Sequence, residues 1–262
     1  ARGKIITPLK DRIGSEVLTH YPEEVELGMA ITQQEAWIDR AADGDDTARP
    51  VRVPDFIAEV VERVAFEARI DKRIDKRSGV SQRMPITVLE NVVSNAERRA
   101  LLAGESEIVP RLSDVFAAQS AITGKIELEY EGELVGGHAI ARELIRRAAD
   151  ATFRARAGGV NVDDVIVWFD EGGALQVSDD LPAAVAAQAF ATVPGLVDTI
   201  HHVGLAATGD DAFTTAACEL ALEALVARRK ISRSDAGQYG RAQPEQRRRS
   251  GGQDLFGGGM SA

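Results

Sequence analysis

Lys76-Arg77-Ser78-Gly79-Val80-Ser81-Gln82-Arg83-Met84-Pro85 is a polar, basic stretch that leads directly into an apolar run. After Pro85, apolar residues recur three or four positions apart, at Ile86, Leu89, Val92, Val93, Ala96, Ala100 and Leu101. This spacing predicts a helix with one face packed inward. Pro85 suits the first turn of that helix, because the N–H that proline lacks would have no partner there.

Arg83 is expected just ahead of this helix, on a loop made pliable by Ser78, Gly79 and Ser81. A guanidinium offers a planar fork of donors, and a helix start adds unpaired N–H groups, so the two together can hold an anion. The alternative interpretation is an exposed arginine at a loop edge with no ligand.

A second stretch, Pro8-Leu9-Lys10-Asp11-Arg12-Ile13-Gly14, lies near the front of the chain. The two stretches together resemble the AAA+ ATPases of the magnesium-chelatase motor subunit and its MoxR-type relatives. In that group, a Leu-x-Asp-Arg-Phe-Gly segment carries the arginine finger, and a later Ser-x-Arg at a lid helix carries the sensor-2 arginine. Here Ile13 replaces the aromatic residue and Gln82 occupies the variable position. The resemblance covers the first hundred or so residues better than the remainder.

The resemblance implies roles for five residues. Arg12 would act in trans as an arginine finger, and Asp11 would orient it. Arg83 would contact the nucleotide of its own subunit. Arg77 and Lys76 would strengthen the positive electrostatic field. The alternative for these two residues is that both are solvated loop charges. The implied cofactors are ATP and Mg²⁺, and the implied partners are further copies in a ring and a von Willebrand A domain protein.

A nucleoside triphosphatase also needs a glycine-rich loop that cradles phosphates, with a lysine and a hydroxyl residue that meets magnesium. This chain contains no G-x-x-x-x-G-K-[ST], and no apolar strand ending in paired acids precedes Arg12. It begins at Ala1 rather than Met, which favours a piece of a longer protein. We expect that this piece alone does not hydrolyse ATP.

The expected fold class is mainly α, with four parts. Residues 1–50 would end an AAA+ α/β nucleotide domain, and 51–105 would form a helical lid. Residues 106–228 would form a mainly helical module with a small β-hairpin, and 229–262 a disordered basic tail.

The clearest helix of the first half is expected from Pro54 to about Asp71. Its inner stripe is predicted to be Ile57, Val60, Val61, Val64, Ala65 and Ala68, with Glu59, Glu62, Arg63 and Glu67 outside. Further helices are expected within 23–39, where Ile31, Ala36, Trp37 and Ile38 are candidate buried residues, and near 109–120, 138–151, 181–190 and 211–230.

Strands are expected at 14–20, ending at Pro22, and in a hairpin of 164–169 with 174–177 around Gly172-Gly173. Trp168 and Phe169 are expected to fill a local core. Residues 126–131 alternate like a strand, although an acidic helix or loop fits as well.

Charge is distributed unevenly along the chain. The net charge of −10 argues against general nucleic-acid binding by the folded part. From Arg228 to Ala262 there are eight basic and three acidic residues, which indicates a charged partner or self-association. Leu255-Phe256 within this tail is a candidate short docking motif.

A single cysteine, Cys218, excludes an internal disulfide and fits a reducing cytoplasm. It is flanked by small apolar residues and is expected to pack in a helix rather than to react. No apolar run has membrane-spanning length, and no signal-peptide pattern opens the chain.

No metal site is predicted. Asp43, Asp45 and Asp46 lack the later glutamate of an EF-hand, so a solvated loop is favoured there. His201 and His202 would point in different directions on a helix and have no accompanying ligand cluster.

Two other classes of function stay open. One is a transcription-linked AAA+ regulator, although no helix-turn-helix stands out. The other is a non-enzymatic interaction module, with 106–228 as a helical scaffold and the tail as a tether. The sequence does not indicate the remodelled partner, the ring size, or whether the output is metal insertion or a chaperone function.

Overall fold

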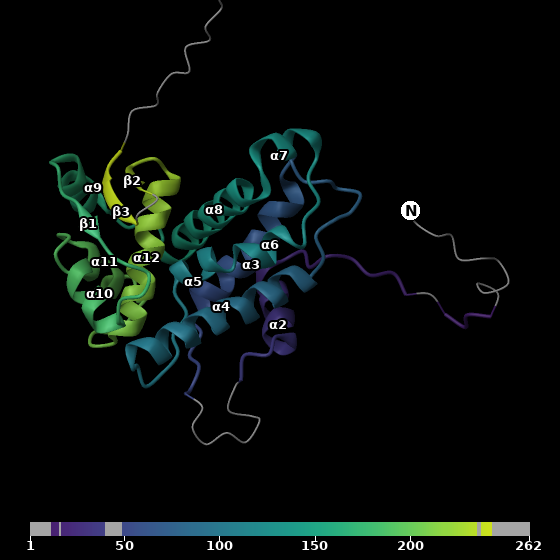
Figure 1. Cartoon of the computed structure of the whole chain (residues 1–262), viewed down its shortest axis with the longest axis horizontal. Helices are drawn as coiled ribbons and strands as arrows, with labels where there is room; N and C mark the ends of the chain where they lie inside the picture. The colour runs from purple at the N-terminus through teal and green to yellow at the C-terminus, as the bar shows by residue number, and fades with distance from the viewer. Residues whose placement is uncertain (1–11, 16, 40–48, 235–236, 243–262) are drawn as a thin grey trace, which may run out of the picture.

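The computed structural model describes residues 12–15, 17–39, 49–234 and 237–242 (Figure 1). The described chain is mainly helical, as expected, with one small antiparallel sheet. The helices of the first half are α2 Val25–Glu35, α3 Asp55–Ile70, α4 Arg83–Ala103, α5 Leu112–Ala117, α6 Gln119–Thr123 and α7 Tyr130–Val135. The second half contains α8 Gly137–Ala157, α9 Asp163–Asp170, β1 Leu175–Gln176, α10 Ala183–Phe190, α11 Leu196–His202, α12 Asp211–Ala227, β2 Ile231–Arg233 and β3 Gln238–Arg241.

Helix α8 is the central helix of the molecule. It packs against α3 on one side and against α12 on the other, so α2–α7 form a first lobe and α9–β3 a second lobe (Figure 1). One hydrophobic cluster runs through both lobes, from Ala36 to Tyr239. The helices on either side of the boundary expected near residue 105, α4 and α5, both contribute to this cluster, and Ala96, Ala100 and Ile108 form a second, smaller one.

The α3 stripe forms as predicted, and all six of its apolar residues are buried. Two of the three glutamates expected outside, Glu59 and Glu62, are buried as well, so that part of the prediction is wrong. The reason is that α3 is covered on more than one side, by α2, α4 and α8. Glu59 is held there by the Arg63 and Arg156 guanidinium groups, at 2.7 Å and 2.6 Å.

The predicted hairpin of 164–169 with 174–177 is wrong. Residues 163–170 form helix α9, in which Val165 and Phe169 are one turn apart and both buried. A short apolar run fits a helix or a strand equally well, and Asp163 and Asp164 in the first turn favour the helix. Trp168 packs on the core and meets the Phe169 ring edge-on at 4.9 Å, so the local core expected there is confirmed.

Order extends further toward the C-terminus than predicted. The expected disorder of 229–262 is wrong for the described residues of that range, because β2 and β3 pair there with Ser232 opposite Gly240. Strand β1 joins the other edge of β3, where Leu175 lies opposite Tyr239. The buried Tyr239 ring packs in the core and holds the sheet against it. The polar composition of this segment alone did not indicate this apolar burial. Leu255-Phe256 lies outside the described residues.

Of the remaining predictions of secondary structure and burial, some are confirmed and others are wrong. The described residues of 14–20 form no strand, and Trp37 is 54% exposed rather than buried. In 126–131, Leu128 makes one isolated bridge with Ile74, and α7 begins at Tyr130, so no continuous strand forms. The helices expected near 109–120, 138–151, 181–190 and 211–230 are present as α5 with the start of α6, α8, α10 and α12.

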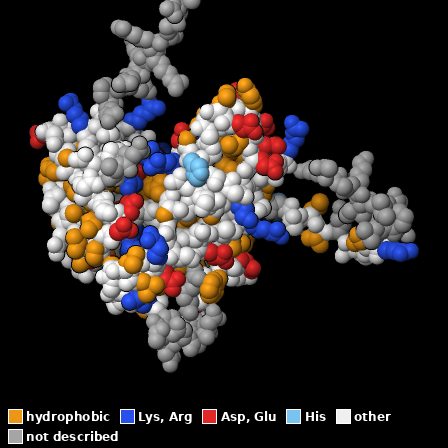
Figure 2. All heavy atoms as spheres, in the orientation of Figure 1, with side chains coloured by type: hydrophobic (Ala, Val, Ile, Leu, Met, Phe, Trp, Pro, Cys, Tyr) orange, Lys and Arg blue, Asp and Glu red, His pale blue; other side chains and the backbone are white. Residues whose placement is uncertain are grey.

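None of the helices in the described part of the chain is both long enough and apolar enough to cross a bilayer. On the face shown in Figure 2, acidic, basic and apolar side chains are interspersed rather than sorted into one large patch.

Candidate functional site

The turn that precedes α4 places Arg83 at the surface. Arg83 is the first residue of α4, and its side chain is exposed. The sequence had placed it just ahead of the helix, and the structure places it within the first turn, two residues before Pro85. The Met84 N–H closes this turn onto the Ser81 carbonyl at 3.0 Å. The Met84 N–H is used in this bond and Pro85 has none, so Arg83 extends from a helix end at which the helix dipole is what favours an anion.

Gln82, the residue before Arg83, points the other way, into a buried polar cluster. Its Nε2 lies 2.9 Å from each oxygen of the Glu62 carboxylate and 3.1 Å from the Thr32 hydroxyl. The Thr32 hydroxyl donates to Glu62 at 2.9 Å. Gly28 makes room for this cluster, since a Cβ there would overlap the Glu62 side chain. Gln82 is thus fixed to both α2 and α3.

Burial dominates the electrostatics of Glu62 and raises the pKa of its carboxyl, although the hydrogen bonds from Gln82 and Thr32 oppose the shift. The nearby Arg69 guanidinium also favours the charged form of Glu62. Burying a charged carboxylate whose hydrogen-bond donors are neutral costs free energy. In this protein the buried Glu62 carboxylate holds the turn in one orientation.

Arg69 connects the same turn to the N-terminal segment. Its Nε donates to the Val80 carbonyl at 3.1 Å, and its Nη2 donates to the Gln82 side-chain oxygen at 3.0 Å. The guanidinium lies over the Tyr21 ring, 4.4 Å from its centroid, and the Tyr21 hydroxyl accepts the Val80 N–H at 3.2 Å. Burial lowers the pKa of Arg69, and the Glu62 charge opposes this.

Arg12 lies in an exposed segment. The described residues of 12–20 are all exposed, and Val17 and Leu18 are 81% and 88% exposed. This segment meets the body at Tyr21 and the buried Pro22. Asp11 lies outside the described residues. Arg12 and Arg83 are therefore on separate segments, and these segments are joined through Tyr21 and Arg69.

Arg77 belongs to a neighbouring hollow. Arg77 and Lys76 are both exposed, and the Arg77 N–H donates to the Asp75 carboxylate at 2.7 Å. With Tyr130 and Glu131 from α7, they line a hollow of about 690 Å³. Its wall carries lysine, arginine and carboxylate groups together, so it does not present a single-sign surface.

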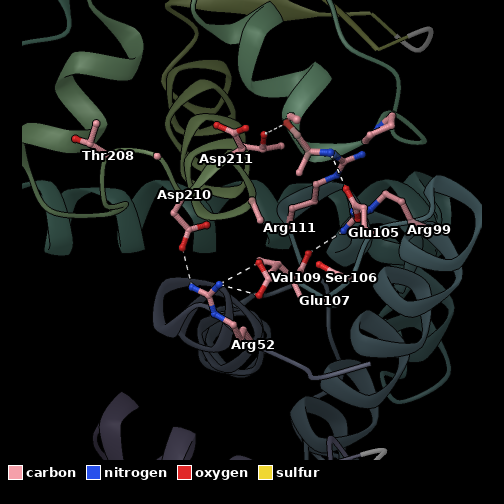
Figure 3. Close-up of a pocket in the computed structure, with 16 residues that line it drawn as sticks. Arg52, Arg99, Glu105, Ser106, Glu107, Val109, Arg111, Thr208, Asp210 and Asp211 are labelled. Atoms are coloured by element: carbon pink, nitrogen blue, oxygen red, sulfur yellow. Dashed lines mark hydrogen bonds and ion pairs between the residues drawn. The ribbon is translucent and has the colours of Figure 1, made fainter. Parts of the chain in front are cut away.

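A second polar region, which the sequence did not indicate, is a cavity of about 600 Å³ between the lobes (Figure 3). It lies between the end of α4 and the N-terminal ends of α10 and α12. Arg52 bridges one side of it, with Glu107 at 2.8 Å and Asp210 at 2.7 Å, and it lies over the Phe213 ring. Figure 3 shows both carboxylates converging on the Arg52 guanidinium.

The inner wall of this cavity contains two buried arginines. Arg99 donates to Glu105, Asp114 and the Val109 carbonyl at 3.1, 3.0 and 2.8 Å. Arg111 donates to Ser113, to two backbone carbonyls and pairs with Glu219 at 3.2 Å.

The two helix ends that face the cavity already have carboxylate partners. Glu105 accepts the Ala183 N–H at the start of α10, and Asp210 accepts the Phe213 N–H at the start of α12. Because the three cavity arginines are also paired with carboxylates, the cavity has no excess positive charge for an anion. We interpret it as the joint between the lobes. No pattern in the sequence indicated this cavity, because its lining residues come from segments far apart in the chain, from Arg52 to Thr215.

The remaining candidates offer no reactive centre in the described chain. His201 contacts the Thr214 hydroxyl at 3.2 Å and His202 is exposed. Cys218 is fully buried in α12, and this burial raises the pKa of its thiol. Within the ranges that the structure describes, no three His, Cys, Asp or Glu side chains are grouped to hold a metal ion. Asp43, Asp45 and Asp46 lie outside those ranges.

Comparison of the chain with protein-family models, with curated proteins and with solved structures finds no match.

Proposed function

We propose that this chain is part of a ring-forming AAA+ ATPase, similar to the magnesium-chelatase motor subunit or to MoxR-type proteins, that couples ATP hydrolysis to work on a partner. In this proposal, α3 and α4 with the turn between them are the helical lid. The observation that carries the proposal is Arg83, an exposed guanidinium on a helix start whose preceding residue is fixed by a buried network.

Arg83 fits a phosphate contact in its own subunit. Its charge is at the surface, and the start of α4 adds a favourable helix dipole. Arg12 fits a different role, because it lies on an exposed segment at a distance along the chain from the lid. From there it would reach the γ-phosphate in an adjoining subunit and stabilise charge that develops during transfer.

ATP would supply the phosphoryl group, and Mg²⁺ would offset the negative charge of its phosphates. This chain contains no phosphate-cradling motif, and its described residues contain no group of three His, Cys, Asp or Glu side chains that could hold a metal ion. The proposal therefore assigns the phosphate loop and the magnesium ligands to another part of the protein.

The test uses the intact protein and two substitutions. Arg12→Ala should reduce ATP turnover by on the order of 10³-fold while nucleotide binding is retained. Arg83→Ala should instead reduce the difference in affinity between ATP and ADP. Arg98→Ala is the matched control, since Arg98 is an exposed arginine on the same helix as Arg83.

The trans role of Arg12 can be tested by mixing subunits. Arg12→Ala subunits mixed with subunits whose phosphate loop is disabled should regain turnover, because some interfaces then combine a working loop with a working arginine. An Arg12→Ala ring that keeps full activity, and therefore shows no recovery on mixing, would refute the proposal.

The output of the motor is a separate question. Magnesium insertion into a porphyrin, with the partner subunits supplied, would support the chelatase type. Intact ATPase activity without insertion would support remodelling of a partner such as a von Willebrand A domain protein.

A further inference from the structure

We propose that Tyr21 and Arg69 are positioning residues that couple the segment carrying Arg12 to the turn carrying Arg83. This inference rests on the proposed function, and it deepens it by naming the contacts that join the segment carrying Arg12 to the turn carrying Arg83.

The first step of the path is the contact between Tyr21 and the turn. Tyr21 is where the exposed segment of Arg12 reaches the body. Its hydroxyl accepts the Val80 N–H at 3.2 Å, three residues before Arg83. Gly79 has φ of 69° and lies so close to the Tyr21 hydroxyl that an added Cβ would overlap it. The backbone of the turn is therefore shaped to receive this side chain.

The second step is the Arg69 guanidinium, which contacts both sides. One face lies on the Tyr21 ring, while Nε and Nη2 donate to Val80 and to Gln82. Because the donors of a guanidinium lie in one rigid plane, a shift of the turn must tilt the plane that rests on Tyr21. Lysine could not reproduce this, since its ammonium is a point charge without a plane.

The third step makes the turn respond as a unit. Gln82 receives Arg69 on its oxygen and approaches Glu62 with its nitrogen, so its amide has a single favourable orientation. Arg83 follows Gln82 directly in the chain. A force on the Arg83 side chain is therefore transmitted to Gln82, whose own side chain is hydrogen-bonded to Arg69.

The Arg69 Nη1 atom is buried and has no hydrogen-bond partner among the described residues. A buried donor without a partner costs free energy. This unpartnered donor indicates that the contacts with Tyr21, Val80 and Gln82 determine the position of the guanidinium, although they leave one of its N–H groups without a hydrogen bond.

The link can be tested on this chain alone by amide hydrogen exchange. Tyr21→Phe removes the acceptor of the Val80 N–H and should speed exchange of that amide roughly three- to tenfold. Tyr21→Leu also removes the ring under Arg69 and should extend the effect to the Met84 amide. Tyr130→Leu is the matched control, because Tyr130 is an exposed tyrosine on another helix. Unchanged exchange at Val80 in Tyr21→Leu would overturn the inference.

The coupling is tested in the intact ring with Arg69→Met and the conservative Arg69→Lys. Arg69→Met should bring the affinities for ATP and ADP closer together, and Arg69→Lys should restore little of the difference. A purely structural role would lower the melting temperature and leave the affinity ratio unchanged, so an unchanged ratio also overturns the inference.

These outcomes are distinguishable from failure of the proposed function. If Arg12→Ala and Arg83→Ala rings hydrolyse ATP like the parent, the motor proposal fails, whatever the exchange result. If those two variants lose activity while Arg69→Met keeps its full discrimination between ATP and ADP, the motor proposal stands and the coupling path is wrong.

Discussion

Replacement of Arg111 by methionine should be among the most destabilising single changes in this protein. The side chain is 1% exposed and lies between the lobes, where it pairs with Glu219 of α12 and donates to carbonyls of the segment between β1 and α10. Methionine has a similar length but no charge. It would leave the buried Glu219 carboxylate without its cation and the Leu181 carbonyl without its donor.

The magnitude follows from which group stays behind. Removal of one member of a buried ion pair costs about 3–5 kcal/mol, because the remaining charge stays desolvated. Burial already raises the pKa of Glu219, and the Arg111 charge lowers it, so loss of Arg111 raises it further. A raised pKa in the folded state means that stability is lost as pH rises through it. The loss from Arg111→Met should therefore be smaller near pH 5 than near pH 8.

Urea unfolding of three variants measures this. Arg111→Met with Glu219→Gln removes both charges while the amide oxygen can still accept the Ser113 N–H, which donates to Glu219 at 2.8 Å in the parent. The double variant should be more stable than Arg111→Met by about 1–3 kcal/mol. Arg98→Met, at an exposed site, should change stability by less than about 0.5 kcal/mol. A loss below about 1 kcal/mol for Arg111→Met, or strictly additive losses in the double variant, would refute the reasoning.

Three further outcomes follow from the described contacts. Glu62→Gln puts an amide N–H against the Gln82 and Thr32 donors and should cost about 1–3 kcal/mol in urea unfolding. Because burial raises the pKa of Glu62, the parent is favoured at low pH, so this cost should shrink between about pH 5 and about pH 8, and a constant cost would contradict the pKa shift. Gly79→Ala, at φ of 69° and against Tyr21, should lower the unfolding free energy by about 1–3 kcal/mol, whereas Gly104→Ala, at the same φ with open space, should cost only about 1–2 kcal/mol. Native Cys218 should react with a thiol reagent only after urea unfolds the chain, since it is fully buried and its pKa is raised; rapid labelling of the folded protein would show that α12 opens.

The sequence predicted the long helices well because their stripes are long enough for a period to be counted. Val60, Val64 and Ala68 of α3 are all buried, as their spacing indicated. Short elements were predicted less well. The run that forms α9 carries too few residues to distinguish a helix from a strand, and β3 depends on pairing with strands far along the chain.

The candidate site was predicted in part. Pro85 and the apolar period predicted Arg83 just ahead of the helix, and the structure places it, exposed, as the first residue of α4. The buried side of the same turn could not be predicted. A glutamate such as Glu62 is expected to face water, and its burial depends on α2, which covers α3 from a distant part of the sequence.

The continuity of the core changes what a moving lid would be. A lid of residues 51–105 that rotated by itself would have to separate α3 from α8 and break the pair between Arg99 and Asp114. Both side chains of this pair are buried, and removing a buried charge from its partner costs several kcal/mol. The exposed residues before Tyr21 make no core contact among their described residues, whereas α2 packs against α3 and α4. If Arg83 responds to a nucleotide, the body that moves with it should therefore include α2 through β3 as one unit. The Tyr21–Arg69 contact lies where the chain enters that unit.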